Sequence, residues 1–325
     1  MKKVSVCIPV YGVEKFIERC AKSILEQDYP ELDIIFVDDR SKDNSISILN
    51  DLLDEYPLRA KQVRVISHLS NRGLAAARNT AVSNAIGDFI LHVDGDDYIS
   101  SNFVSSLIQE QTKGDFDIVF GAFTILQKGK RVLRTMPVKL SLHDLLLKVL
   151  SLQLPHNVCG ALIRSSLYRN NDISNIEGVN NTEDLQIMPK LLYYACSYSV
   201  NNNSFYYYDC SSNSTSYTNK PRVSSSRQAW VTFDDLFKFF GKGQIEYLEA
   251  LSQGKALNLS MQMTRWSQYK EESVYYLELV NMSKHIASKT LKNIPIKYRV
   301  VLLIKKRFWV ALYVRLNKLI KKLHV

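Results

Sequence analysis

The first predicted strand–helix turn lacks the glycine-rich patterns that hold phosphate in the common nucleotide-binding folds. Residues 9–14 contain one glycine, Gly12, and neither GxGxxG nor GxxxxGK(S/T) is found there. This excludes both a Rossmann phosphate cradle and a P-loop at this turn. A nucleotide bound here would need another group to neutralise its phosphates.

Two further absences bound the class of protein. The five cysteines form no CxxC pair and are odd in number, so neither a zinc site nor a complete disulfide framework is indicated. No uncharged stretch reaches the ~18–20 residues of a transmembrane helix, because Lys305–Arg307 interrupts the best apolar run. The run Val4–Val10 includes Ser5 and Pro9 and lacks a small-residue cleavage site, so it predicts a strand rather than a signal peptide. We expect a cytoplasmic protein in a reducing compartment.

Acidic residues are absent from the C-terminal segment 279–325, which holds 12 Lys and Arg. The formal net charge of +10 therefore divides into −2 for residues 1–278 and +12 for this segment. A nucleic-acid-binding protein carries its cations on the folded surface that meets the phosphates. The distribution therefore argues against a nucleic-acid partner.

The first hundred residues alternate short β-branched runs with amphipathic stretches, which is typical of βαβ units and a largely parallel sheet. The expected strands are Val4–Val10, Asp33–Val37, Val63–Ile66 and Phe89–Val93. The second strand ends in Asp38-Asp39, and the fourth leads into Asp94-Gly95-Asp96-Asp97. Because ligands of open α/β sheets bind beyond the carboxyl ends of the strands, both acidic clusters are expected to face one cleft.

Helical stretches separate these strands, and the pattern is less regular after residue 100. The last helix of the first part is expected at Leu74–Ile86, with Gly87 at its C′ position. A further helix is predicted from Asp184 to Ala195. The polar stretch Ser197–Ser226 predicts a surface loop, and the sequence is helical from Gln228 to the end.

The motif Asp94-Gly95-Asp96 offers a way to neutralise phosphates. Two carboxylates at a strand end can hold a hard divalent cation that also bridges two phosphates. The alternative is an ordinary acidic turn, since Asp and Gly are favoured in turns. The second acidic pair, Asp38-Asp39, favours a site, because clustered carboxylates repel one another unless a cation or ligand compensates.

Five segments in order carry a resemblance to a known family. They are Val4–Tyr11, Val37–Asp43, Asn71–Asn79, Gly87–Asp97 and Thr182–Asp184. Together they resemble the glycosyltransferase family 2 enzymes of GT-A fold, which transfer a sugar from a nucleotide donor with inversion. The resemblance covers about residues 1–215. It implies an α/β GT-A domain at 1–220, with a nucleotide-sugar-binding half at 1–100 and an acceptor half at 101–220, and a helical region at 221–325.

The resemblance implies roles for individual residues at the donor site. Pro9 and Tyr11 would flank the uracil base of a UDP-sugar. Either Asp38 or Asp39 would accept hydrogen bonds from the uracil imide and the ribose, and the sequence leaves open which of the two does so. Arg78 would reach the nucleotide.

The resemblance also implies a metal and a general base. Asp94 would hold the ribose or bridge through water to the metal, and Asp96 would ligate Mn²⁺ or Mg²⁺ against the diphosphate. Asp184 would deprotonate the acceptor hydroxyl, a role worth ~10²–10⁴ in rate for a positioned carboxylate. The alternative for Glu183-Asp184 is that the two acids only complement the helix dipole.

Two positions depart from the pattern of the family. Arg40 stands where the family commonly has glycine or another small residue, which suggests a less tight turn after Asp39. Asp209 follows Tyr206–Tyr208 where many relatives have a basic residue, so a contact from this loop to the diphosphate is not expected.

The basic amphipathic tail, residues 297–325, is predicted to be a helix. Its apolar residues Phe308, Leu312, Leu316, Leu319 and Leu323 would share roughly 80° of arc, opposite Lys306, Arg307, Lys318 and Lys321, whereas Leu303, Val310 and Val314 fall on the charged side. We expect the tail to bind the anionic inner face of the cell membrane, where the acceptor would be a lipid-linked glycan. The alternative is a helix that packs on the protein.

The sequence thus predicts inverting, metal-dependent transfer from a UDP-sugar to a hydroxyl of a glycan, in surface polysaccharide synthesis. A sugar-phosphate nucleotidyltransferase is the first alternative, but it would need the glycine-rich loop that is missing near the N-terminus. The second is a non-catalytic, membrane-associated nucleotide-sugar-binding protein, against which the presence of both Asp96 and Asp184 counts.

Overall fold

The computed structural model describes residues 1–127, 130–210, 222–269 and 272–323, and the chain divides into two compact units. The first unit comprises Met1–Leu145 and His156–Pro221. The second comprises Leu146–Pro155 and Arg222–Val325. Residues 146–155, which fall within the predicted acceptor half, therefore cluster with the helical unit.

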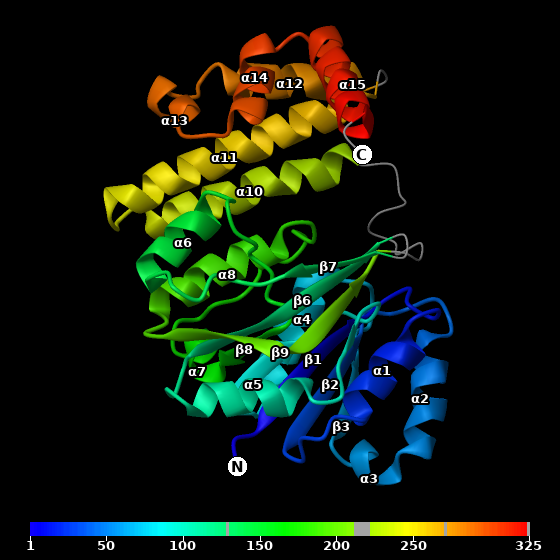
Figure 1. Cartoon of the computed structure of the whole chain (residues 1–325). Helices are drawn as coiled ribbons and strands as arrows, with labels where there is room; N and C mark the ends of the chain where they lie inside the picture. The colour runs from blue at the N-terminus through cyan, green and yellow to red at the C-terminus, as the bar shows by residue number, and fades with distance from the viewer. Residues whose placement is uncertain (128–129, 211–221, 270–271, 324–325) are drawn as a thin grey trace. The chain divides into compact units, whose positions relative to one another are not determined.

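The first unit is built on one mixed sheet (Figure 1). Its strands are β1 Val4–Val10, β2 Leu32–Asp38, β3 Val63–Ser67, β4 Phe89–His92, β5 Tyr98–Ile99, β6 Ile118–Gln127, β7 Lys130–Arg134, β8 Ala161–Arg164 and β9 Tyr198–Asp209. The strand order is β3-β2-β1-β4-β8-β6-β9-β5, and β7 pairs with β6. β1 to β4 run parallel, whereas β8 runs antiparallel to β4 and β6.

Helices connect the strands of this sheet along the chain. They are α1 Ile17–Leu25, α2 Ser45–Glu55, α3 Pro57–Ala60, α4 Leu74–Asn84, α5 Phe103–Thr112, α6 Leu142–Leu150, α7 Ser165–Arg169 and α8 Glu183–Tyr194. The apolar positions of α1 that recur at helical spacing, among them Ile17 and Ile24, are fully buried in one core with residues of β1 and β2. The four N-terminal strands and the helices between them are thus confirmed.

The parallel pairing brings the ends of β1, β2 and β4 to one edge of the sheet. Val10 lies opposite Asp38, and the backbone N–H of Asp39 donates to the carbonyl of Val10 at 3.0 Å. On the other side of β1, Cys7 lies opposite His92, the last residue of β4. The segments that follow these strands, with the two acidic clusters, therefore leave the sheet together.

Two predictions of local structure are wrong. Ser197–Ser226 is not a loop throughout, because β9 occupies Tyr198–Asp209 and pairs with both β6 and β5. The polar side chains of β9 are tolerated because they find partners, as when Asn201 donates to the carbonyl and hydroxyl of Ser106. Gly87 is not a helix C′ residue either: α4 already ends at Asn84, and a Cβ on Gly87 would lie 2.6 Å from the backbone nitrogen of Ser5.

The second unit is helical. Its helices are α10 Val223–Phe240, α11 Ile245–Trp266, α12 Ser273–Ser283, α13 Ser288–Lys292, α14 Ile296–Ile304 and α15 Arg307–Leu323. The core of this unit surrounds Trp266, a fully buried side chain whose indole N–H donates to the hydroxyl of Ser226 at 3.1 Å. In the parts of the chain that the structure describes, no helix combines the length and apolarity needed to cross a bilayer.

Candidate active site

A cavity of about 330 Å³ opens where β1, β2 and β4 end. It is lined by Pro9, Val10, Tyr11, Val13, Asp39, Asn71, Gly73, Leu74, Ala77, Asp94, Gly95, Asp96 and Asn180. Five of the predicted site residues, Pro9, Tyr11, Asp39, Asp94 and Asp96, are thus brought together. The other three, Asp38, Arg78 and Asp184, are not among the lining residues.

Asp39, rather than Asp38, lies on the wall of this cavity. Its carboxylate accepts from the backbone N–H groups of Arg72 (2.8 Å) and Gly73 (2.7 Å) and from His68 Nδ1 (2.7 Å). Asp38 turns to its own loop and accepts from the N–H of Ser41. The three donors fix Asp39 in place on the cavity wall. Which of the two aspartates contacts the base stays a prediction.

A glycine sets the approach of α4 to this carboxylate. Gly73 precedes α4 with a φ of +89°, a conformation that L side chains rarely adopt. A Cβ at Gly73 would also clash with the side-chain amide of Asn180. The Asn180 carboxamide oxygen in turn accepts from the N–H of Ala75 at 2.9 Å, which ties the loop before α8 to the first turn of α4.

The acidic turn after β4 carries three carboxylates in different surroundings. Burial, and next the charge of Asp94, raise the pKa of Asp96 to about 6. Asp97 is almost fully buried and accepts from the Tyr206 hydroxyl at 2.6 Å. A Cβ at Gly95 would lie 2.9 Å from the carbonyl oxygen of Pro9, so only glycine lets the turn sit this close to β1.

Asp209, which departs from the family pattern, is part of a structured contact beside this turn. Its carboxylate pairs with Arg19 of α1 at 2.7 Å, and its N–H donates to Asp97 Oδ1 at 3.3 Å. Arg19 also donates to the carbonyl oxygen of Asp96 at 3.1 Å. Arg19 was not predicted as a site residue. In the sequence it was only one of the charged residues on the polar side of an amphipathic helix.

Arg40, the second departure, adopts a strained backbone conformation. Its φ of +60° lies in the left-handed region that favours glycine, the residue type that the family commonly has there. The turn after Asp39 therefore keeps the conformation expected for glycine although a side chain is present.

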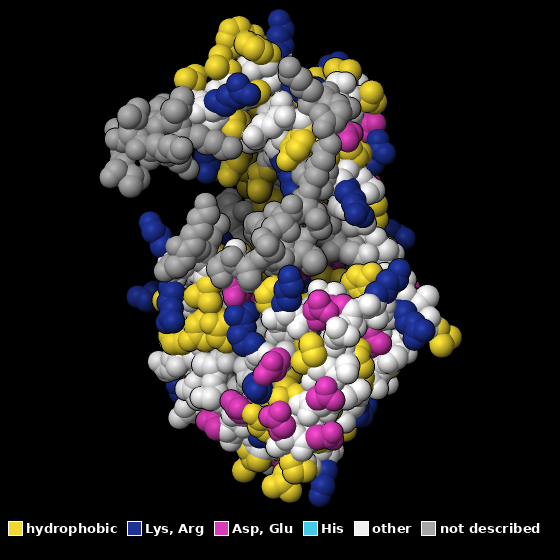
Figure 2. Space-filling view, turned by 90° about the vertical axis from the view of Figure 1, so that its right-hand side faces the viewer, with side chains coloured by type: hydrophobic (Ala, Val, Ile, Leu, Met, Phe, Trp, Pro, Cys, Tyr) yellow, Lys and Arg dark blue, Asp and Glu magenta, His cyan; other side chains and the backbone are white. Residues whose placement is uncertain are grey.

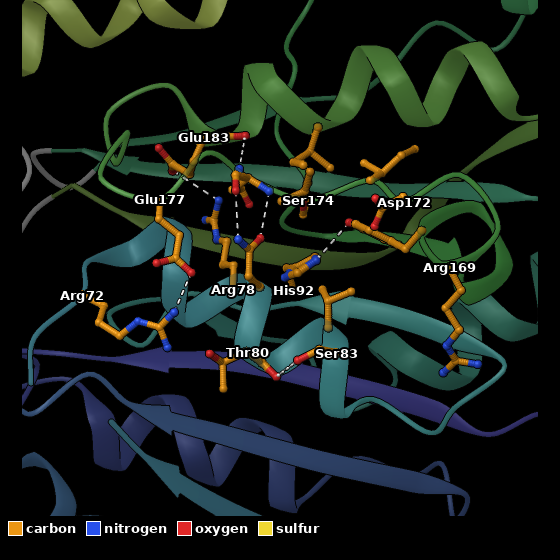
Figure 3. A pocket seen from close by; sticks show the side chains of 17 residues that line it. Arg72, Arg78, Thr80, Ser83, His92, Arg169, Asp172, Ser174, Glu177 and Glu183 are labelled. Carbon is orange, nitrogen blue, oxygen red and sulfur yellow. Dashed lines mark hydrogen bonds and ion pairs between the residues drawn. The ribbon is translucent and has the colours of Figure 1, made fainter. Parts of the chain in front are cut away.

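Arg78 holds three carboxylates together, and its side chain is 3% exposed. Its Nη1 donates to Asp184 at 2.5 Å and to Glu183 at 3.2 Å, and its Nη2 donates to Asp94 at 2.9 Å. Figure 3 shows Arg78 extending from α4 toward Glu183 at the start of α8. The predicted base and the acidic turn are therefore joined through one guanidinium group.

Arg78 and Glu183 border a second cavity of about 520 Å³, which is drawn in Figure 3. Burial raises the pKa of Glu183 to about 8, a rise that the charge of Arg78 opposes and that of Asp184 increases. Burial and then Arg78 lower the pKa of His92 to about 3, so this histidine is neutral and contacts the hydroxyl of Tyr168. Glu183 was missed as a functional candidate because its position beside Asp184 suggested only helix-terminal charge.

Residues 5–169, half of the chain, match the family described as "Glycosyl transferase family 2". The chain belongs to glycosyl transferase family 2. It is 41% identical over 116 residues to the uncharacterized glycosyltransferase EpsJ of Bacillus subtilis, a match that covers 36% of this chain and 32% of EpsJ. It is 39% identical over 122 residues to the poly(ribitol-phosphate) beta-glucosyltransferase of Bacillus spizizenii, covering 37% of this chain and 19% of that protein.

The alignments thus span about a third or less of these two relatives. Among solved structures, that of Staphylococcus aureus TarS 1-349 in complex with UDP-GlcNAc superposes with a TM-score of 0.76 at 19% identity. The match covers 98% of this chain and 92% of that one. It confirms the predicted α/β GT-A fold followed by C-terminal helices.

Proposed function

We propose that the protein transfers a sugar, with inversion, from a UDP-sugar to a hydroxyl group of a glycan acceptor in surface polysaccharide synthesis. The observation that carries this proposal is the cavity at the strand ends, whose wall combines an aromatic ring, a fixed carboxylate and the Asp94-Gly95-Asp96 turn. Family membership supports the reaction class. The UDP-GlcNAc complex of TarS, which shares the fold, supports a UDP-sugar donor.

The donor base is proposed to lie against Pro9 and Tyr11. The Tyr11 side chain is half exposed and lines the cavity, so its ring is available to cover a uracil. An ionised carboxylate offers about four acceptor positions, and three on Asp39 are used by protein donors. The remaining position suits the imide N–H of uracil.

The acidic turn fits an open metal site. Within the described residues, no three His, Cys, Asp or Glu side chains are grouped to hold a metal ion. Mg²⁺ is usually held by one or two carboxylates, with substrate phosphates and waters completing the shell, and Asp94 and Asp96 both line the cavity. Burial and the charge of Asp94 raise the pKa of Asp96, and a cation bound there would favour the ionised form of this carboxyl. We propose that Asp96, assisted by Asp94, holds Mn²⁺ or Mg²⁺, which would act as a Lewis acid toward the departing diphosphate.

Asp184 is proposed as the general base. Inversion requires the base and the leaving group on opposite sides of the sugar. Arg78 stands between Asp184 and Asp94 and pairs with both, so the two carboxylates are held apart by the width of one guanidinium group. The fork of Arg78 also fixes the orientation of Asp184, which a proton acceptor for a hydroxyl group needs. Contact between Arg78 and the nucleotide stays a prediction.

The acceptor is proposed to be lipid-linked, with the protein held at the inner face of the membrane through its C-terminal helices. Phe308 and Trp309 at the start of α15 are 71% and 52% exposed, and Leu303 just before them is also exposed. Lys305 and Lys306 lie between these residues in the sequence. Aromatic rings next to cations suit the interface of an anionic bilayer.

Release of UDP from UDP-GlcNAc and UDP-glucose, with Mn²⁺ or Mg²⁺ present, tests the proposal directly. Asp184→Asn should lower transfer by at least ~10²-fold, because it removes the general base, and should leave the affinity for UDP within about twofold. Asp51→Asn, at an exposed position of α2, is the matched control and should change neither quantity. Equal losses of transfer and UDP binding in Asp184→Asn would assign Asp184 to the donor site instead.

A further inference from the structure

A cationic β-hairpin stands outside the proposed donor site. Residues 118–143 contain five Lys and Arg and no acidic residue. Three of these cations, Lys130, Arg131 and Arg134, lie on β7, where every residue is exposed. Within the described part of the chain, none of the three forms an ion pair. Their charge is therefore available to a partner.

Strand register places this hairpin next to the acidic turn. Arg131 lies opposite Leu126 of β6, and Leu126 lies opposite Asp209 of β9. Neighbouring strands are about 4.8 Å apart, so the backbones of Arg131 and Asp209 are about 10 Å apart. Asp209 in turn donates its N–H to Asp97 of the turn. The hairpin therefore borders the catalytic region without lining the donor cavity.

Two tyrosines continue the sheet face that carries Arg131. Alternate residues of a strand share a face, and Tyr207 lies two residues before Asp209 on β9. Its ring stacks on that of Tyr98 with centroids 4.6 Å apart. Tyr98 lies opposite Tyr207 in the pairing of β5 with β9, so both tyrosines lie on the face that carries Arg131. Both tyrosines are partly exposed.

The side of the molecule toward which the hairpin points faces the viewer in Figure 2. On this side, Lys and Arg side chains gather beside hydrophobic ones toward the upper margin of the first unit, whereas Asp and Glu spread lower on the same unit. On this face, Lys and Arg side chains are thus most frequent near the upper margin of the first unit.

We propose that the hairpin binds the acceptor glycan through negatively charged groups on that glycan. Arg131 lies on the face of the sheet that carries Tyr98 and Tyr207, and Lys130 and Arg134 lie on the opposite face of the exposed strand β7. The inference rests on the proposed function and adds the acceptor class: a glycan that carries phosphate or carboxylate groups. The donor phosphates belong in the cavity, which the hairpin does not line, so these cations meet a second anion. Arginine and lysine on an exposed strand can hold phosphate by charge-assisted hydrogen bonds, and β7 carries three such cations and no acidic residue.

Binding of inorganic polyphosphate, a chain of anions without sugar, tests the surface separately from the reaction. The triple variant Lys130→Gln/Arg131→Gln/Arg134→Gln should bind labelled polyphosphate about tenfold more weakly than the wild type. The dependence of its log Kd on log salt should also be shallower, because fewer cations meet the phosphates and fewer counterions are released. Neutral dextran should bind neither protein measurably. Because all three side chains are exposed, the thermal midpoint should be unchanged.

A control of equal charge separates the hairpin from net charge. Lys2→Gln/Lys61→Gln/Lys113→Gln removes three exposed cations elsewhere on the first unit and should keep wild-type polyphosphate affinity and salt dependence. Equal weakening in both triple variants would overturn the inference. A hairpin variant that keeps its affinity for polyphosphate but no longer binds phosphatidylglycerol vesicles would also overturn the inference. In that case the hairpin would bind lipid rather than the glycan.

The failure of the proposed function has a different signature. If neither UDP-GlcNAc nor UDP-glucose is turned over or bound, the transferase proposal fails, whatever the hairpin binds. If both triple variants release UDP from the donor at the wild-type rate while only the hairpin variant loses polyphosphate affinity, the inference stands.

Discussion

Replacing Arg78 by methionine removes the one cation that three carboxylates share. The substitution keeps an unbranched side chain but leaves Asp94, Glu183 and Asp184 without their common partner. Breaking a buried ion pair by removing one member costs about 3–5 kcal/mol, because the remaining charge is buried and uncompensated. For a unit of roughly 200 residues, such a loss lowers the melting temperature by about 10 °C.

The pH dependence of this loss distinguishes electrostatics from packing. Arg78 lowers the pKa values of Asp94 and Glu183, so both values should rise in the folded variant. The folded variant then retains protons that the unfolded chain releases. Its stability therefore falls as pH rises, and the gap to the wild type should shrink when the pH is lowered from about 7.5 toward about 4.5. Thermal unfolding followed by circular dichroism at these two pH values measures both quantities.

A second arginine close by in the sequence provides the control. Arg72 pairs with Glu177, but both side chains are about half exposed. Arg72→Met should cost less than about 1 kcal/mol, as exposed ion pairs do. Equal losses in the two variants, or a loss in Arg78→Met that is the same at both pH values, would refute the argument that the buried cluster depends on this guanidinium.

Three other outcomes are expected. Gly73→Ala should lower the free energy of unfolding, measured in urea, by about 1 kcal/mol more than Gly178→Ala does. Both glycines have a positive φ, but only at Gly73 would a Cβ clash with a neighbouring side chain. In the wild type, the folded Glu183 carboxyl keeps its proton up to a pKa of about 8, whereas the unfolded one loses it near 4.5, so the free energy of unfolding should fall between about pH 4.5 and 8. Glu183→Gln should remove this fall. Urea unfolding of both proteins at several pH values measures it. Trp309→Ser should weaken sedimentation with phosphatidylglycerol vesicles several-fold, whereas Leu277→Ser, a similarly exposed apolar position on α12, should not.

The inner strands of the parallel half, β1, β2 and β4, were predictable because they are buried on both faces. β1 and β2 are buried along nearly their whole length, so they read as continuous apolar runs. β9 was not predictable from its composition, since its Asn and Ser side chains and backbone are satisfied by residues about a hundred positions away. A two-residue strand such as β5 has no periodicity to detect.

The positions of the candidate site residues were only partly predictable. Motifs at strand ends located Asp39, Asp94 and Asp96, because the edge where parallel strands end is fixed by the topology. The cluster around Arg78 was not visible, since it joins α4 to a helix start 105 and 106 residues later. The raised pKa of Glu183 comes from burial, a property that appears only when these segments meet.

The C-terminal helix shows why the two interpretations of the basic tail are compatible. Val310 and Val314, which fall on the charged side of the predicted helical wheel, are both buried, and Val310 packs in the core of the second unit. Phe308 and Leu316 stay exposed, and Phe308 lies about 200° from Val310 around the helix at about 100° per residue. Packing therefore uses one side of α15 and leaves the aromatic side free, so a helix that docks on protein can also present an apolar face with neighbouring cations.

The side chains of Leu319 and Leu323, which the prediction placed on the same face, lie outside the described residues. The described part of that face is compatible with the proposed membrane contact, because an interfacial helix needs one apolar side and not a span.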